Sequence, residues 1–256
     1  QGPAILSFGF RPFFLFGAIW AALAMTLWVL MLSGQNILPT TFYPVSWHAH
    51  EFLFGYLGAV LAGFLLTAVP NWTGRLPIVG WPLAGLVTLW LAGRMAVAVS
   101  ALMPWWGAMA IDLAFPLALA AVLGREIITG RNWKNLTVLA LVLGLALANG
   151  LYHLDTARGG YPASGLGLRL GLGIAVMLIS LIGGRIVPSF TRNWLAQRRS
   201  PVLPVPNGRA DSVVLALSLA AVLVWVALPA HGLTAVACAV AGTAQLWRLS
   251  RWSGRH

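Results

Sequence analysis

Between Phe13 and Trp247 the chain repeatedly runs through about 20 mostly apolar residues and then breaks at a short stretch that carries Gly, Pro or Arg. A helix of that length spans about 30 Å, which is the thickness of the hydrocarbon core of a bilayer. Charged residues make up only 8 % of the sequence and the mean hydropathy is +0.84, so polar groups are too scarce to cover a water-soluble fold. The pattern predicts a polytopic membrane protein.

The apolar runs predict about eight spans. They lack the alternation of apolar and polar residues that membrane β-strands show, and the bilayer offers backbone groups no water, so helices are favoured. We therefore expect an all-α transmembrane helical bundle that forms a single membrane domain over residues 1–256. The predicted spans are 13–33, 50–70, 81–102, 105–123, 136–154, 168–188, 212–229 and 232–248.

The basic residues predict the orientation of the bundle. With the N-terminus inside, all of the 16 Lys and Arg except Arg94, Arg158 and Arg169 fall on the inner side. This bias predicts that both termini lie inside. It also accounts for the net charge of +11, because basic loops beside helix ends face anionic lipid. The bilayer is thus an expected partner and nucleic acid is not.

Two similar segments suggest an internal repeat. Val-Pro-Asn-Trp-Thr at 69–73 and Val-Pro-Ser-Phe-Thr at 187–191 each end a predicted span, and Arg75 and Arg192 follow them. We expect the proline in each segment to end its helix. The spacing predicts a parallel repeat of four helices, about 10–124 and about 131–250, with a chance match as the alternative.

The segment Trp-His-Ala-His-Glu at 47–51 lies at the outer end of the second predicted span. Residues two apart on a helix point roughly 200° from each other, so His48 can face the same ion as His50 only from a non-helical cap. Imidazole binds copper, iron and haem iron, and Glu51 could coordinate directly or fix a ring tautomer. The predicted metal ligands are His48, His50 and Glu51. The alternative is a pair of interfacial histidines bound to water and headgroups.

Other polar residues lie at the same membrane level. His153 ends the fifth predicted span, where its ring can turn into the bundle toward the start of the second. Arg94 and Asp112 both lie roughly 10–12 Å below the outer surface on neighbouring spans, which predicts a buried ion pair. The pair could be structural, or Arg94 could hold an anionic group such as a haem propionate while Asp112 positions it. His153 could instead be a hydrogen-bonded core residue. The candidate cofactor-binding residues are His48, His50, His153, Arg94 and Asp112.

Common enzyme motifs are missing from the sequence. It contains no Ser/His/Asp grouping, Walker loop or dinucleotide fingerprint, so a hydrolase, an ATPase or a dehydrogenase is not indicated. A transporter or permease without a redox metal is one alternative function, although few polar residues fall at the bilayer midplane where substrates are usually held. A passive assembly or sensor subunit is another. Whether the protein is an enzyme stays open at this point.

Several blocks of sequence resemble the NnrS family of bacterial membrane proteins. The resemblance implies a haem- and copper-containing protein of the inner membrane, linked to nitric oxide and nitrosative stress in denitrifying and related bacteria. Nitric oxide or iron-nitrosyl species would then be its partners, and the electron donor is not identified. The blocks are Gly9–Phe14 (GFRPFF), Trp47–Tyr56 (WHAHEFLFGY), Ala62–Arg75 (AGFLLTAVPNWTGR) and Gly183–Asn193 (GGRIVPSFTRN).

The resemblance is incomplete in two respects, the length of the chain and the residues that can be matched to the family. Family members are longer, so it implies that this chain lacks the C-terminal third of the family pattern. Only His48, His50 and Glu51 carry over residue by residue, and His153 is predicted from its position alone. From the resemblance we expect an outward-facing histidine site for haem iron or copper, which nitric oxide reaches through the lipid.

Overall fold

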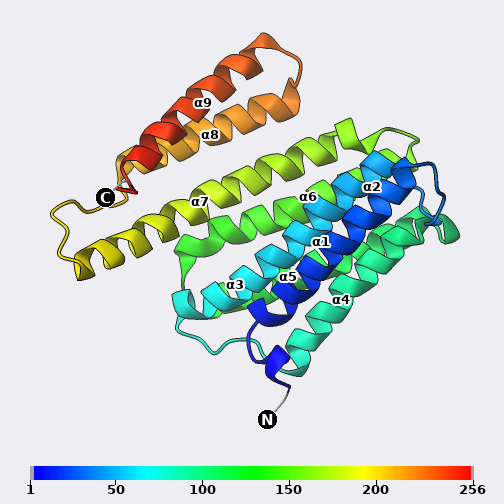
Figure 1. Ribbon diagram of the computed structural model, residues 1–256, viewed down its shortest axis with the longest axis horizontal. Coiled ribbons are helices and arrows are strands. Elements are labelled where there is room, and N and C mark those ends of the chain that lie inside the picture. Colours follow the sequence, from blue (N-terminus) through cyan, green and yellow to red (C-terminus); the bar gives the residue numbers. More distant parts are fainter. Residues whose placement is uncertain (1–2, 255–256) are drawn as a thin grey trace. The chain divides into compact units, whose positions relative to one another are not determined.

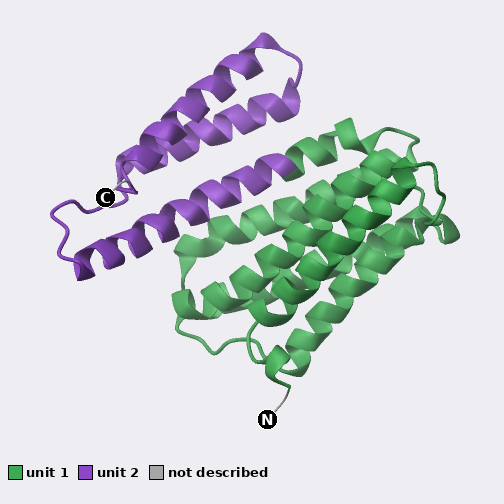
Figure 2. Cartoon of the chain, viewed as in Figure 1, with its two compact units in different colours: residues 1–171 green, residues 172–256 purple. Residues whose placement is uncertain are grey.

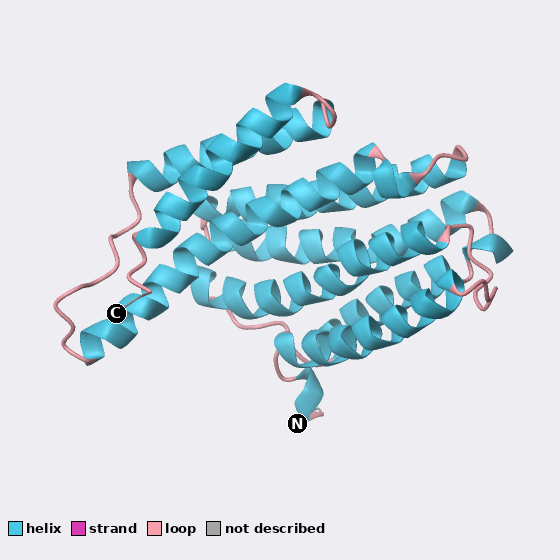
Figure 3. Ribbon diagram, turned by 45° about the horizontal axis from the view of Figure 1, so that its top comes forward, coloured by secondary structure: helices cyan, strands magenta, loops and turns pink. Residues whose placement is uncertain are grey.

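The computed structural model describes residues 3–254, and every regular element among them is a helix (Figures 1 and 3). Arg255, one of the basic residues assigned to the inner side, lies outside the described residues. The predicted all-α bundle is confirmed. Its long helices are α1 (Phe10–Leu32), the continuous helix Pro44–Thr73, α4 (Trp81–Ala98), α5 (Trp105–Thr129), α6 (Leu136–Ala157), α7 (Leu166–Gln197), α8 (Arg209–Ala227) and α9 (Gly232–Ser250).

Seven of these helices are long and apolar enough to cross a membrane. They include each of the first seven predicted spans, so the chain is a multi-pass membrane protein. The eighth predicted span, 232–248, forms helix α9 but is not one of the seven. Its sequence includes Gln245 and Arg248, which lower its hydropathy.

The second predicted span begins at Pro44 and consists of three helical segments. These are α2 (Pro44–His50), the π-helical segment η2 (Glu51–Tyr56) and α3 (Leu57–Thr73). Pro44 lies at the first helical position, where the fixed φ of proline favours a helix start. The π-helical segment divides this long helix at the level of the candidate site.

The expectation that Pro70 and Pro188 end their helices is wrong. Pro70 lies inside α3, which ends at Thr73, where Gly74 takes up a left-handed conformation with φ 70°. Pro188 lies inside α7, which continues to Gln197. A proline removes a single backbone N–H, and membrane helices tolerate this loss where neighbouring groups satisfy the freed carbonyl. The four-helix repeat stays a prediction.

The chain divides into two compact units, residues 1–171 and 172–256 (Figure 2). In unit 1, α4 packs on α5, α5 on α6, and α3 on both α1 and α5. Its buried side chains include Trp47, Leu65, Trp90 and Tyr152. In unit 2, α8 packs along α9. The candidate site lies entirely within unit 1.

Candidate metal centre

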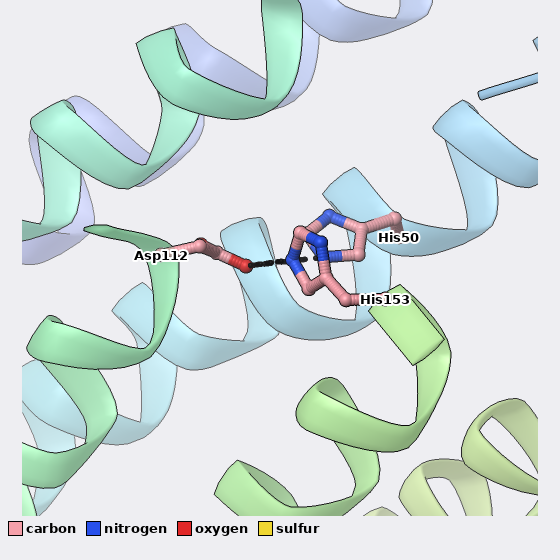
Figure 4. Close-up of side chains that lie close together, drawn as sticks. All are labelled: His50, Asp112 and His153. Atoms are coloured by element: carbon pink, nitrogen blue, oxygen red, sulfur yellow. Dashed lines mark hydrogen bonds and ion pairs between the residues drawn. The ribbon is translucent and has the colours of Figure 1, made fainter. Parts of the chain in front are cut away.

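Three helices of unit 1 bring two histidines and a carboxylate together. His50 comes from α2, Asp112 from α5 and His153 from α6, and their possible ligand atoms all lie within 4.8 Å of one another. Asp112 Oδ2 is 3.1 Å from Nε2 of His50 and 3.1 Å from Nε2 of His153. Figure 4 shows both imidazole rings facing this carboxylate, and all three residues are buried. We refer to them as the His50–Asp112–His153 cluster.

The π-helical segment helps to set the direction of the residues at its start. Neighbouring residues on a regular helix point about 100° apart, yet His50 and Glu51 are both fully buried. They lie where α2 passes into the wider π turn, a distortion that is frequent at functional sites. Trp90 Nε1 donates to the carbonyl oxygen of Gly55 at 2.9 Å, which ties the π-helical segment to α4.

Arg94 links the two carboxylates that flank the histidines. Its Nη1 donates to both carboxylate oxygens of Glu51 at 2.8 Å, and its Nη2 donates to Asp112 Oδ1. Glu51 also accepts a hydrogen bond from Trp20 Nε1 at 2.7 Å. The predicted ion pair between Arg94 and Asp112 is therefore confirmed. Because both terminal nitrogens of Arg94 bind protein carboxylates, the structure gives this side chain a positioning role.

Asn149 is a site residue that the sequence analysis did not select. Its Nδ2 donates to Asp112 Oδ2 at 2.8 Å, and its Oδ1 lies 2.9 Å from His50 Nε2. It precedes His153 by one helical turn on α6, and residues four apart share a helix face. That spacing was the signal in the sequence that could have identified it.

The structure does not bring His48 to the cluster. The segment Pro44–His50 is helical, so the expected non-helical cap is wrong and His48 points away from His50. Its ring stacks on Trp28, with the ring centroids 3.9 Å apart, and also lies against Phe52. Of the three predicted metal ligands, the structure brings His50 and Glu51 together and leaves His48 elsewhere.

With both imidazoles neutral, the cluster carries one more negative than positive charge. Nδ1 of His50 is 3.1 Å from Glu51 Oε1, and Nε2 of the same ring faces oxygens of Asn149 and Asp112. A neutral imidazole carries only one N–H, so one of these nitrogens faces oxygen without a hydrogen. In addition, two buried carboxylates share the single guanidinium of Arg94. A proton on the ring or a bound cation would restore the balance.

The donor set fits a single metal ion. Two imidazole nitrogens and a carboxylate oxygen suit copper, zinc or iron. Glu51 holds the second nitrogen of His50, as outer partners of ligating histidines commonly do. A porphyrin does not fit between the two rings, because Asp112 Oδ2 lies 3.1 Å from both of them.

Comparison with known proteins identifies the family of the chain. The family profile described as NnrS protein matches residues 4–256. No curated protein and no solved structure matches the chain. The match extends over all of the long helices, including those that carry the cluster. The chain belongs to the NnrS family.

Proposed function

We propose that this chain is a bacterial inner-membrane protein of the nitric oxide response that holds a copper ion at the His50–Asp112–His153 cluster. It would handle or buffer nitric oxide or its iron-nitrosyl products and so protect against nitrosative stress. Membership of the NnrS family supports the biological role. The observation that carries the metal site is a buried set of ligand atoms that, with neutral imidazoles, has one more negative than positive charge.

The residues around the cluster have separate roles in this proposal. A bound copper ion would supply a redox centre able to bind nitric oxide. Glu51 orients the His50 ring through Nδ1, which leaves Nε2 directed at Asp112. Arg94 fixes both carboxylates and offsets part of their charge. Phe42 covers both imidazoles, with ring centroids 5.4 Å from His50 and 5.5 Å from His153, and excludes water.

Metal analysis of the detergent-purified protein tests the proposal. After expression with added copper and haem, we expect stoichiometric copper in the wild type and its loss in His50→Ala and His153→Ala. His231→Ala is the matched control, because His231 is exposed and caps α9 by accepting a hydrogen bond from Leu233 N. His48→Ala should also keep copper, since its ring lies outside the cluster. Copper retained in both cluster variants would contradict the proposed site.

The same variants test where haem binds and whether the cluster is needed for the biological role. A Soret band that persists in His50→Ala and His153→Ala would locate haem ligands outside the cluster. In cells, the wild type should restore growth under nitrosative stress to a strain without the gene, and His50→Ala should not. A wild-type protein with neither copper nor haem after supplementation would favour a permease without a redox metal.

A further inference from the structure

A small, partly enclosed cavity borders the cluster at Asp112. Its walls are mostly apolar, and its volume is about 20 Å³, counted as the space open to the centre of a water-sized sphere. A cavity needs roughly 10–15 Å³ by that measure to hold one water molecule. It can therefore hold about one very small molecule. The apolar lining includes Phe54, Gly58, Leu61, Phe115, Leu119 and Leu145.

Polar residues of the candidate site also line this cavity. Arg94, Asp112 and Asn149 line it together with the apolar residues. Nε of Arg94 is buried and has no hydrogen-bond partner within residues 3–254. Buried polar groups are rarely left unpaired, so an unpaired N–H beside a cavity is consistent with a ligand that has an electronegative atom. The lining of the cavity thus consists mostly of apolar side chains together with three polar ones.

The loop between α1 and α2, residues 33–43, covers part of the cluster. Phe42 is 4 % exposed and packs on the rings of both cluster histidines. The loop is fixed to Ser100 by the hydroxyl of Thr40 at 3.1 Å and by the backbone N–H of Thr41 at 3.0 Å. Phe42 therefore shields the two imidazoles from bulk water where it packs on them.

We propose that the cavity is a docking chamber for an uncharged diatomic gas beside the metal centre. The identity of the gas as nitric oxide rests on the proposed function. The apolar part of the lining suits a small apolar guest, whereas a charged ligand would pay the full cost of leaving water. The small volume excludes larger substrates. The chamber holds the gas next to Asp112 and Arg94.

Xenon is a suitable probe because it is small and apolar and needs no metal to bind. In xenon-pressurised crystals of the full chain, we expect one anomalous peak in the wild type between Gly58, Phe115 and Leu145. Gly58→Leu should abolish it. The first added carbon would lie 3.9 Å from Phe115, an ordinary contact, and the remaining carbons would fill the chamber. The matched control is Gly85→Leu on α4, where no atom lies within 4 Å of an added carbon, and it should keep the peak.

A second variant changes the chamber in the opposite direction. Leu145 is 6 % exposed and lines the cavity, so Leu145→Ala should enlarge it and raise the xenon occupancy at a given pressure. An absent xenon peak in the wild type, or a hydrogen-bonded water in its place, would overturn the proposal. So would a peak that survives Gly58→Leu.

The xenon and copper measurements test the chamber and the metal centre independently. Xenon bound to a protein without copper would support the chamber and reject the proposed metal centre. Copper bound to a protein that shows no xenon peak would support the metal centre and reject the chamber. Where copper is present, photolysed nitric oxide should recombine more slowly in Gly58→Leu than in Gly85→Leu. Equal rates in these two variants would contradict the chamber as the docking place of the gas.

Discussion

Each of the two units buries a cluster of charged and polar side chains, and the two clusters differ in charge balance. In unit 2, Arg248 Nε donates to Asp211 Oδ1 at 2.9 Å, and its Nη1 donates to the carbonyl oxygen of Ser180 at 2.9 Å. Gln245 Nε2 donates to the hydroxyls of Ser180 and Ser218. We call this set the Asp211–Arg248 cluster. Its single carboxylate also lies 3.5 Å from Arg251.

The Asp211–Arg248 cluster is accounted for by structure alone, whereas the His50–Asp112–His153 cluster is a candidate for function. The carboxylate of the Asp211–Arg248 cluster has two guanidinium partners, so it needs no further cation. In unit 1, Glu51 and Asp112 share one guanidinium, and two imidazoles face the second carboxylate. Buried charge in a membrane protein is costly in both cases. With neutral imidazoles the unit 1 cluster has an excess of negative charge that the unit 2 cluster does not have, and this difference, not burial, makes it the candidate cation site.

The largest loss of stability is expected from Arg94→Leu. This change leaves Glu51 and Asp112 buried without their common guanidinium, and breaking such a pair costs about 3–5 kcal/mol. The measurement is the free energy of unfolding in mild detergent. Arg158→Leu is the control, because Arg158 is exposed at the end of α6. Equal stability of the two variants would show that Arg94 does not hold the cluster together.

A smaller loss is expected from Arg248→Leu in unit 2. Asp211 would keep Arg251 nearby and would still accept the backbone N–H of Gly208 at 3.0 Å. The cost of the remaining unpaired oxygen is about 1–3 kcal/mol. Copper content should not change. The charge-balance comparison fails if this variant is less stable than Arg94→Leu or loses copper.

Asp112→Asn tests the negative charge directly. The amide has nearly the same shape, and removal of the excess charge offsets part of the lost ion pair, so the fold should weaken by about 1 kcal/mol. Copper should nevertheless fall to background, because the only carboxylate ligand is gone. Asp211→Asn, the corresponding change in unit 2, should keep copper. Similar copper contents in both variants would reject the assignment of the ion to Asp112.

The smallest effect is expected from Trp90→Phe. The change removes only the hydrogen bond from the indole to Gly55, and single hydrogen bonds in membrane proteins average about 0.6 kcal/mol. Since Gly55 belongs to the π-helical segment that carries Glu51, copper affinity should also fall. Ser218→Ala removes two hydrogen bonds in unit 2, one from Gln245 Nε2 and one to the carbonyl oxygen of Val214, and should cost at least as much free energy without affecting copper. Titration of copper into both purified variants distinguishes these results.

Much of the fold could be predicted from the sequence because hydrocarbon provides no hydrogen-bond partners for the backbone. Each predicted span is a helix, since a backbone in hydrocarbon must satisfy its own hydrogen bonds. The ion pair of Arg94 and Asp112 followed from their equal depth, since isolated charges at that depth are costly. The boundaries were less accurate. The second helix begins at Pro44 instead of residue 50, and this difference removed the cap on which the role of His48 depended.

The candidate site was only partly predictable for a different reason. Helical periodicity relates residues on one helix, as with Asn149 and His153, but carries no information about which faces of separate helices meet. The π-helical segment gave no signal inside a continuous apolar run, although it lies where His50 and Glu51 turn inward together.

The sequence by itself determined that the chain crosses a membrane as helices and that the charges of Arg94 and Asp112 within its spans must be paired, because the bilayer penalises unsatisfied backbone groups and isolated ions. Only the tertiary structure decided which of those charges share a site. The packing of α2, α5 and α6 brings the imidazoles of His50 and His153 to the carboxylate of Asp112 and directs His48 to Trp28 instead. The physical reason is that helix packing depends on side-chain contacts between distant segments, which local sequence patterns do not encode.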